Sequence, residues 1–294
     1  MLTPEQVQFY RDNGYLVASN VISKAELANL QKITDDFIEQ SRSVTACTDV
    51  FDVEDSHTPE NPRLRRLMKP ELRHPDYAAL FKHPGLIKVL QQLLGPSVRH
   101  KGLKMNLKPP GGGEPVEWHQ DWAYYPHTND DLCVLAVMLD DVTLENGPMM
   151  VVPGTHKGRI YDHFQDGLFA GAITEDLDED LKRAVPVTGK AGDISVHHAR
   201  TLHGSSHNMS NNYRRLLFIT ARAADAWPIT EKVDFEAYNK MMLVGEPCEP
   251  RLADVPVRLP FPAVTYPGQS IFVKQAGLRN SPFRKEEKKE KVNA

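Results

Sequence analysis

A mostly β fold is predicted, because short apolar runs alternate with turn-forming clusters between about residues 98 and 223. Two helix-capping patterns precede this region, and a third helix is expected at 85–94, ending before Gly95 and Pro96. Regularly spaced short strands are typical of an all-β sandwich or barrel. The runs expected to form strands are 103–107, 133–139, 149–152, 193–197 and 216–220.

The first ninety-five residues are expected to be largely helical. Thr3 with Gln6 forms one capping box, followed by Pro4 at the first helical position, and Ser23 with Glu26 forms another. Residues 41–66 are polar and show no sustained period, so they are expected to form a mobile loop, with a lid as one use for it.

A single domain over residues 1–283 is expected, with a helical part at 1–95, a β core at 96–225 and a covering segment at 226–283. The polar stretch 162–191 is expected to leave the core near one mouth. Proline-rich sequence at 256–262 is expected to be extended, and the Lys/Glu run at 284–294 to be a disordered tail.

Composition narrows the classes of function. The chain has 294 residues, 40% of them hydrophobic and 25% charged, which fits an ordinary folded protein. A net charge of −4 argues against nucleic acid as a partner, and no apolar run is long enough to span a membrane. A cytoplasmic location is expected, and the oligomeric state is left open. Cys47, Cys133 and Cys248 are odd in number and widely spaced, which favours reduced thiols.

The most informative pair of residues is His119 and Asp121. Two positions apart on an extended chain, they point to the same face. A second imidazole, for which His203 is the candidate, would complete the two-histidine, one-carboxylate triad of non-haem Fe(II) oxygenases. The ordinary alternative, a structural hydrogen bond between histidine and aspartate, stays open on spacing alone. His74 and Asp76 have the same spacing but flank Pro75 near a helix, so they are assigned to the surface.

Arg214 favours the metal site. It alternates with Leu216 and Phe218 on an apolar strand face, where an arginine needs an anion. A guanidinium can bind a carboxylate through two parallel hydrogen bonds, as the distal carboxylate of 2-oxoglutarate would require. An internal salt bridge is the alternative. Arg215 is expected to face solvent.

These motifs together resemble the phytanoyl-CoA dioxygenase family over roughly residues 5–225. The resemblance implies a double-stranded β-helix (jelly roll, cupin-like) with N-terminal helices packed on it, and it implies Fe(II), 2-oxoglutarate and O2. It is carried by His119-Gln120-Asp121, Leu144-Glu145-Asn146-Gly147-Pro148, Val152-Pro153-Gly154-Thr155-His156-Lys157, Gly192-Asp193, His203-Gly204-Ser205 and Arg214.

The resemblance assigns roles by position. His119, Asp121 and His203 match iron ligands, and Arg214 and Ser205 match residues that hold the distal carboxylate. Gln120 and Lys69 match residues near the co-substrate. The chain departs from the family at Lys104, where methionine is usual, and at Val137, where tryptophan is common. Lys104 is grouped with the residues that bind co-substrate. The wall of the substrate pocket is expected to differ from that of the phytanoyl-CoA enzymes.

Three further histidines are judged by their surroundings. His156 lies in a tight Pro-Gly-Thr-His turn and is not expected to bind metal. One of His197 and His198 is expected to line the pocket as support for a ligand, which is commoner than a fourth ligand.

Hydroxylation of an unactivated C–H bond, with release of succinate and CO2, is the reaction expected. Related halogenases, as the resemblance implies, lack the carboxylate that Asp121 provides, so hydroxylation is favoured over halogenation. Desaturation, epimerisation and ring chemistry stay open. A small, largely apolar substrate of the lipid-like or secondary-metabolite kind is favoured, since aromatic side chains are expected near the mouth and no basic cluster is assigned there. These aromatic residues are Trp122, Tyr124, Tyr125 and Phe169. A zinc hydrolase and a non-catalytic jelly-roll binding protein are the alternatives.

Overall fold

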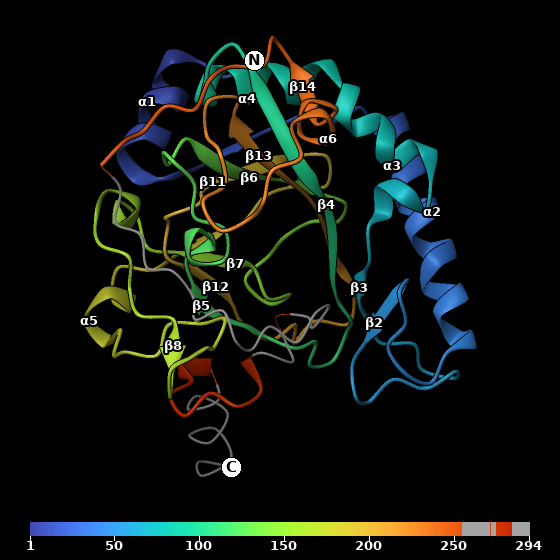
Figure 1. Cartoon of the computed structure of the whole chain (residues 1–294). Helices are drawn as coiled ribbons and strands as arrows, with labels where there is room; N and C mark the ends of the chain where they lie inside the picture. Colours follow the sequence, from blue (N-terminus) through green and yellow to red (C-terminus); the bar gives the residue numbers. More distant parts are fainter. Residues whose placement is uncertain (255–270, 272–274, 284–294) are drawn as a thin grey trace.

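The computed structural model describes residues 1–254, 271 and 275–283 (Figure 1). Its centre is a pair of antiparallel sheets, as the prediction of a mostly β fold requires. The larger sheet has the strand order β1 (Tyr15–Ala18), β11 (Ile194–His198), β6 (Leu132–Met138), β13 (Arg214–Ala223), β4 (Val98–Lys108), β3 (Leu64–Leu67) and β2 (Phe51–Val53), with β14 (Met242–Val244) also paired to β4. The smaller sheet has the order β10 (Val185–Val187), β7 (Met149–Val151), β12 (His203–Ser205) and β5 (Val116–His119).

The two sheets enclose a cavity of about 650 Å³. Side chains of β13 alternate across the larger sheet, as strand geometry demands. Leu216 and Phe218 line the cavity, whereas Leu217 and Ile219 belong to the hydrophobic core on the other face. The architecture is the double-stranded β-helix that was expected, with the functional residues facing inward between the sheets.

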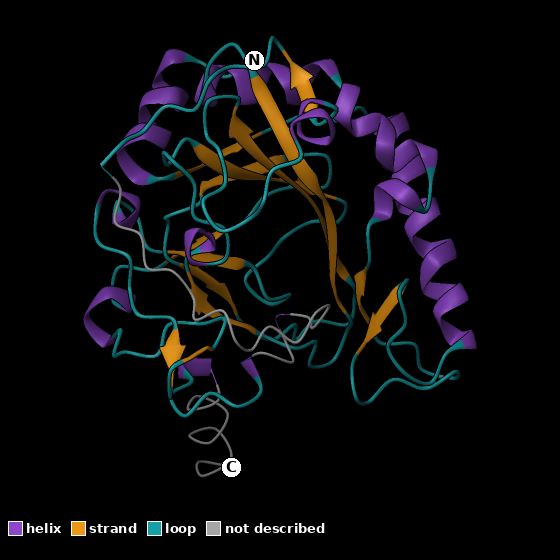
Figure 2. Ribbon diagram, viewed as in Figure 1, coloured by secondary structure: helices purple, strands orange, loops and turns teal. Residues whose placement is uncertain are grey.

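Helices of the N-terminal part cover the outer face of the larger sheet (Figure 2). Both capping boxes are present, and the helix expected at 85–94 is α4. Leu86 and Leu90 of this helix are buried in the core that the helices share with β4 and β13. The helices are α1 (Pro4–Asn13), α2 (Lys24–Gln40), α3 (Pro75–Ala79) and α4 (Pro84–Leu94), with α5 (Asp178–Leu181) and α6 (Phe235–Asn239) later in the chain. Single turns of 3-10 helix are η1 (Ser41–Ser43), η2 (Pro70–Leu72), η3 (Leu80–Lys82), η4 (Asp121–Ala123) and η5 (Thr155–Lys157).

Two segments that were expected to be irregular contain strands. The stretch 41–66 holds β2 and most of β3, which extend the larger sheet, so the prediction of a mobile loop was wrong. The sequence did not indicate these strands because some of their buried positions hold charged residues in place of apolar ones. Arg65 and Asp52 are both buried and pair with each other at 2.8 Å. The stretch 162–191 holds the hairpin of β8 (Phe164–Gln165) and β9 (Leu168–Phe169), then α5, and then β10 of the smaller sheet.

The segment after residue 225 packs on both sheets where the structure describes it. Here β14 pairs with β4, and the ring of Phe283 stacks on Trp118 with 5.9 Å between centroids. The predictions for 256–262 and 284–294 concern positions outside the described residues, and the division into parts of one domain stays a prediction. The three cysteines are unpaired. Among the described residues, no helix combines the length and apolarity that crossing a membrane requires.

Candidate active site

Three side chains of the cavity can hold one metal ion. His119 ends β5, Asp121 begins the 3-10 turn that follows, and His203 begins β12, which pairs with β5 so that the two histidines are direct neighbours across the strands. One nitrogen or oxygen from each of the three lies within 4.8 Å of the other two. The Nε2 atoms of His119 and His203 are each 3.9 Å from a carboxylate oxygen of Asp121. The convergence expected from the sequence is therefore present.

Backbone carbonyls orient both imidazoles. The Nδ1 of His119 is 2.7 Å from the carbonyl oxygen of Glu117, and the Nδ1 of His203 is 2.9 Å from that of Thr201. A carbonyl only accepts, so each Nδ1 carries the hydrogen and each Nε2 keeps its lone pair. Those lone pairs face Asp121, which is the donor set and tautomer that a divalent metal needs.

Electrostatics keep the same groups ready to bind a cation. Burial lowers the pKa of His119 and holds that of His203 well below its ordinary value, so both rings are neutral near pH 7. Burial raises the pKa of Asp121, but a hydrogen bond from His197 and electrostatic interactions with His203 and the positively charged Lys104 outweigh it and hold that pKa well below its usual range. The site therefore offers two neutral imidazoles and one carboxylate.

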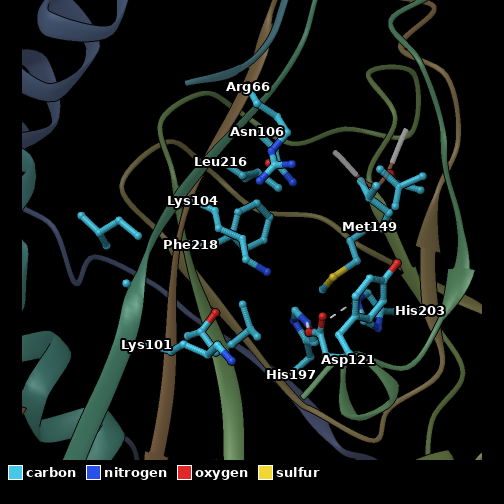
Figure 3. Close-up of a pocket in the computed structure, with 18 of the residues that line it drawn as sticks. Arg66, Lys101, Lys104, Asn106, Asp121, Met149, His197, His203, Leu216 and Phe218 are labelled. Atoms are coloured by element: carbon cyan, nitrogen blue, oxygen red, sulfur yellow. Dashed lines mark hydrogen bonds and ion pairs between the residues drawn. The ribbon is translucent and has the colours of Figure 1, made fainter. Parts of the chain in front are cut away.

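His197 supports the carboxylate. It comes from β11, and its Nε2 lies 3.2 Å from Asp121 Oδ2. The two side chains lie next to each other in the cavity (Figure 3). The expectation that one histidine of this pair lines the cavity is met by His197. His198 points to the opposite side, near the rings of Tyr10 and His156. His156 itself contacts the backbone of α1 and not the cavity.

Arg214 lies in the cavity wall, and no described residue serves as its counter-ion. Only 3% of its surface is exposed, and no ion pair or hydrogen bond of its side chain is found within the described part of the chain. The nearby Asp140 instead receives two hydrogen bonds from the guanidinium of Arg215, at 2.9 and 2.7 Å. An internal salt bridge, the alternative reading of Arg214, is thus absent among these residues. Burial lowers the pKa of Arg214 to about 10, which leaves the group cationic at neutral pH.

Arg215 corrects one expectation. Its side chain is on the outer face of the sheet, but it is only 8% exposed because α2 covers it. In addition to Asp140, it pairs with Asp35 of α2. Alternation was correct in placing it opposite Arg214, but α2 covers that face of the sheet, so the prediction that Arg215 faces solvent was wrong.

Gln120 also differs from its assignment. The resemblance placed it in the co-substrate pocket, yet its side chain points away from the cavity. Its amide nitrogen donates to the carbonyl oxygen of Arg200 at 2.7 Å, and its amide oxygen accepts from the backbone of Tyr161 at 2.9 Å. Strand alternation explains the error, because a chain that aims positions 119 and 121 inward must aim 120 outward. Gln120 ties neighbouring loops together.

The remaining assigned residues line the cavity. Ser205 lies on β12 two positions after His203, Lys69 is exposed at the rim, and Lys104 projects inward from β4. Val137, the other departure from the family, is fully buried in the core.

The aromatic residues expected near the mouth divide into two groups. Tyr124 and Tyr125 line the cavity, while Trp122 is buried in the core. Phe169 is not among the lining residues, but its ring meets that of Tyr124 edge to face at 4.9 Å.

The pair His74 and Asp76 forms a helix cap. The Nδ1 of His74 accepts from the backbone nitrogen of Asp76 at 3.2 Å, and both side chains are partly exposed. The assignment of this pair to the surface was therefore correct.

Sequence reasoning missed Arg66, Lys101 and Asn106, all of which line the cavity. Arg66 and Asn106 are direct neighbours across β3 and β4. For Asn106, the available signal was its alternation with the inward-facing Lys104 on the same strand. Arg66 is the last residue of the stretch 41–66, which was expected to be a loop. The expectation that no basic cluster lies at the mouth was wrong.

Comparison with known proteins agrees with this geometry. The family model described as phytanoyl-CoA dioxygenase (PhyH) matches residues 10–216. The chain belongs to the phytanoyl-CoA dioxygenase family. A relative from Stutzerimonas stutzeri, named as a probable alpha-ketoglutarate-dependent hypophosphite dioxygenase, is 36% identical over 280 residues, which cover 93% of this chain and 97% of the relative. The human peroxisomal phytanoyl-CoA dioxygenase is 27% identical over 83% of this chain and 75% of its own length.

A solved structure shares the fold. The enzyme EctD from S. alaskensis, crystallised with bound iron, superposes with a TM-score of 0.65 at 25% identity, covering 86% of this chain and 87% of that one. The family member described here is therefore an Fe(II)- and 2-oxoglutarate-dependent dioxygenase that uses O2 and acts on a small molecule. A zinc hydrolase and a non-catalytic binding protein are not supported.

Proposed function

We propose that this dioxygenase hydroxylates a small substrate, with iron held by His119, Asp121 and His203, and with 2-oxoglutarate held at its far end by Arg214. One observation carries the proposal: a buried guanidinium without a counter-ion among the described residues lines the same cavity as a buried two-histidine, one-carboxylate cluster. A metal site alone has no need for such a cation.

The three ligands would occupy one side of the ion and leave the opposite side to co-substrate and O2. When bound, the iron and the keto acid supply the oxidising chemistry that no amino-acid side chain provides. The chain's own contribution is orientation. The carbonyl oxygens of Glu117 and Thr201 fix the imidazole tautomers, and His197 restrains one oxygen of Asp121.

Arg214 would bind the distal carboxylate of 2-oxoglutarate through charge-assisted hydrogen bonds, and the Ser205 hydroxyl would donate to the same group. Met149, Leu216 and Phe218 line the cavity between the sheets and would exclude water around the co-substrate. Lys69 lies at the rim, so we assign it a role in guiding anions toward the cavity rather than contact with bound 2-oxoglutarate.

Hydroxylation is favoured over halogenation because Asp121 provides the carboxylate that a halide would replace. Per turnover, one atom of O2 enters the substrate and the other enters succinate, with loss of CO2. The cytoplasmic location and the absence of nucleic-acid and membrane partners stay predictions. A lipid-like substrate is no longer preferred, because basic residues line the cavity and the relative from Stutzerimonas stutzeri is named for a small phosphorus oxyanion.

The test combines two measurements on anaerobically purified protein. Metal analysis should find iron bound after loading with Fe(II), and exposure to O2 with 2-oxoglutarate should release succinate. Mass spectrometry of candidate substrates should then show a gain of one oxygen atom. A protein that binds iron but leaves 2-oxoglutarate untouched would contradict the proposal.

A further inference from the structure

The cavity holds more positive charge than the co-substrate can use. Of the described residues, two acidic side chains line it, Glu71 and Asp121, and so do six lysine or arginine side chains: Arg66, Lys69, Lys101, Lys104, Lys108 and Arg214. Three of them are already accounted for without a substrate. Lys101 pairs with Glu231 at 2.5 Å, Lys69 is exposed at the rim, and Arg214 is proposed to bind 2-oxoglutarate.

Lys108 is also satisfied by the protein. Its Nζ donates to the backbone carbonyl oxygen of Glu114 at 2.8 Å, to that of Ser205 at 3.4 Å and to that of Ser206. It therefore ties the loop after β12 to β4. Apart from Arg214 and the exposed Lys69, the basic residues of the cavity that have no hydrogen-bonded partner in the described part of the chain are Arg66 and Lys104.

Neither Arg66 nor Lys104 forms a hydrogen bond or ion pair with any other described residue, although Lys104 Nζ lies 5.9 Å from the centre of the Tyr125 ring. Asn106, which is paired with Arg66 across the strands, has a buried side-chain oxygen without a partner within the described ranges. Of the positions outside the described residues, 255–270 and 272–274 contain no aspartate or glutamate, whereas 284–294 contains Glu286, Glu287 and Glu290.

These side chains share one part of the cavity. In Figure 3, Arg66 and Asn106 project from β3 and β4 above Lys104, and Lys104 points toward the region of Met149 and Asp121. Lys104 is near enough to both Arg66 and Asp121 to interact with each electrostatically. Lys104 thus lies between Arg66 and the metal cluster, and both cations line the cavity that a substrate would enter.

A count of formal charge shows what they would bind. Iron with two neutral imidazoles and one carboxylate carries +1, doubly charged 2-oxoglutarate makes the sum −1, and Arg214 brings it to zero. The charges of Lys108 and Glu71 cancel, so Arg66 and Lys104 then leave +2 in a largely buried space, where an unpaired charge is costly. A substrate with one or two negative charges would remove that cost.

We propose that Arg66, Lys104 and Asn106 form a subsite for a compact oxyanion on the substrate, such as a phosphonate, phosphinate, sulfonate or carboxylate group. The inference rests on the proposed function, because Arg214 and the metal are taken as occupied by 2-oxoglutarate. Arg66 offers paired N–H donors to two oxygens, and Lys104 offers a point charge on the side of the metal. Asn106 offers its amide hydrogens, while its unpartnered amide oxygen can accept from a protonated oxygen of the group. A C–H or P–H bond at or next to the oxyanion group would then face the oxidant that iron, O2 and 2-oxoglutarate supply.

The test is calorimetric titration of the anaerobic Fe(II) and 2-oxoglutarate complex with methylphosphonate, hypophosphite, methanesulfonate and acetate in separate arms. The dimethyl ester of methylphosphonate is the matched neutral ligand. We expect at least one oxyanion to bind and the ester not to bind. Arg66→Gln and Lys104→Met should each weaken oxyanion binding about tenfold to a hundredfold, as loss of a charge-assisted contact does. Lys88→Met, at an exposed position of α4, is the control and should change it less than about twofold.

Titration of 2-oxoglutarate itself separates the possible failures. Its affinity should stay within about threefold of wild type in Arg66→Gln, which removes a residue that has no assigned role in binding the metal or the co-substrate. Absence of oxyanion binding, wild-type binding in both variants, or an equal loss of 2-oxoglutarate affinity in Arg66→Gln would overturn the subsite. If wild-type protein forms no complex with 2-oxoglutarate, the proposed function fails, and the subsite with it.

Discussion

The adjacent arginines of β13 should give opposite results when each is changed to leucine. Arg214 faces the cavity without an acidic partner among the described residues, whereas Arg215 faces α2 and pairs with Asp140 and Asp35. The two substitutions remove the same charge and the same volume one residue apart. Their difference therefore reports on the direction of the side chain alone.

The magnitudes follow from the contacts. Arg214→Leu would lose a charge-assisted hydrogen bond to co-substrate, worth about 1.5–3 kcal/mol, so 2-oxoglutarate affinity should fall about tenfold to a hundredfold. Stability without ligand should not decrease, since the change removes a buried charge that has no partner. Arg215→Leu leaves the largely buried Asp140 without its guanidinium and should lower the free energy of unfolding by about 3 kcal/mol. The contact with Asp35 adds little, because that carboxylate is 63% exposed.

Two assays separate the variants. Succinate release at varied 2-oxoglutarate gives the apparent affinity, and urea unfolding gives stability with and without 2-oxoglutarate and a non-oxidisable divalent metal. Co-substrate at 100 times its dissociation constant should stabilise wild type and Arg215→Leu by about 2.7 kcal/mol, but not Arg214→Leu at the same concentration. Unchanged affinity in Arg214→Leu, or an equal loss in both variants, would refute the reasoning.

Three further predictions concern the metal site, the turn between α1 and β1, and the dependence of stability on pH. Asp121→Ala should abolish 2-oxoglutarate turnover while the circular dichroism spectrum is retained; persisting turnover would remove this carboxylate from the metal site. Gly14→Ala should destabilise the fold by about 1 kcal/mol or more in urea unfolding, because Gly14 has φ +79° and an added Cβ would lie 2.5 Å from Thr201 Oγ1; an unchanged midpoint would show that the turn can relax. Burial, reinforced by the charge of Arg222, lowers the pKa of His127 to about 3. The free energy of unfolding should therefore fall as pH drops from about 6.5 toward 3, by about 1.4 kcal/mol per pH unit from this residue. His127→Gln should flatten that slope, and an unaltered slope would assign the acid sensitivity to other residues.

Local patterns in the sequence predicted much of the fold. Capping boxes located α1 and α2, and the alternation of β13 correctly separated Arg214 from Arg215. The alternation of β13 could not show which element packs against its outer face. The cover that α2 provides over Arg215 is a tertiary contact, so the sequence could not show that the outward face is buried.

The metal cluster was predictable because its chemistry is unusual, whereas the substrate wall was not. His119 and Asp121 are two positions apart, and His203 was found by the family resemblance and by the strand that it begins. Arg66 escaped notice because it lies on a short charged strand, whose place beside β4 only the folded sheet shows. Gln120 was misassigned because its match to a family position was given more weight than the alternation of side chains along its own strand.

The most direct test of the account is the iron content of protein loaded with Fe(II) under anaerobic conditions and then freed of excess metal. Wild type should retain about one equivalent of iron, and its 2-oxoglutarate complex should show a visible absorbance band that wild type lacks without the keto acid. His203→Ala should lose both signals, whereas His74→Ala, at the surface pair of the same spacing, should keep them. Iron retained in full by His203→Ala, or the band formed equally without that imidazole, would contradict the claim that the inward-facing triad is the catalytic metal site.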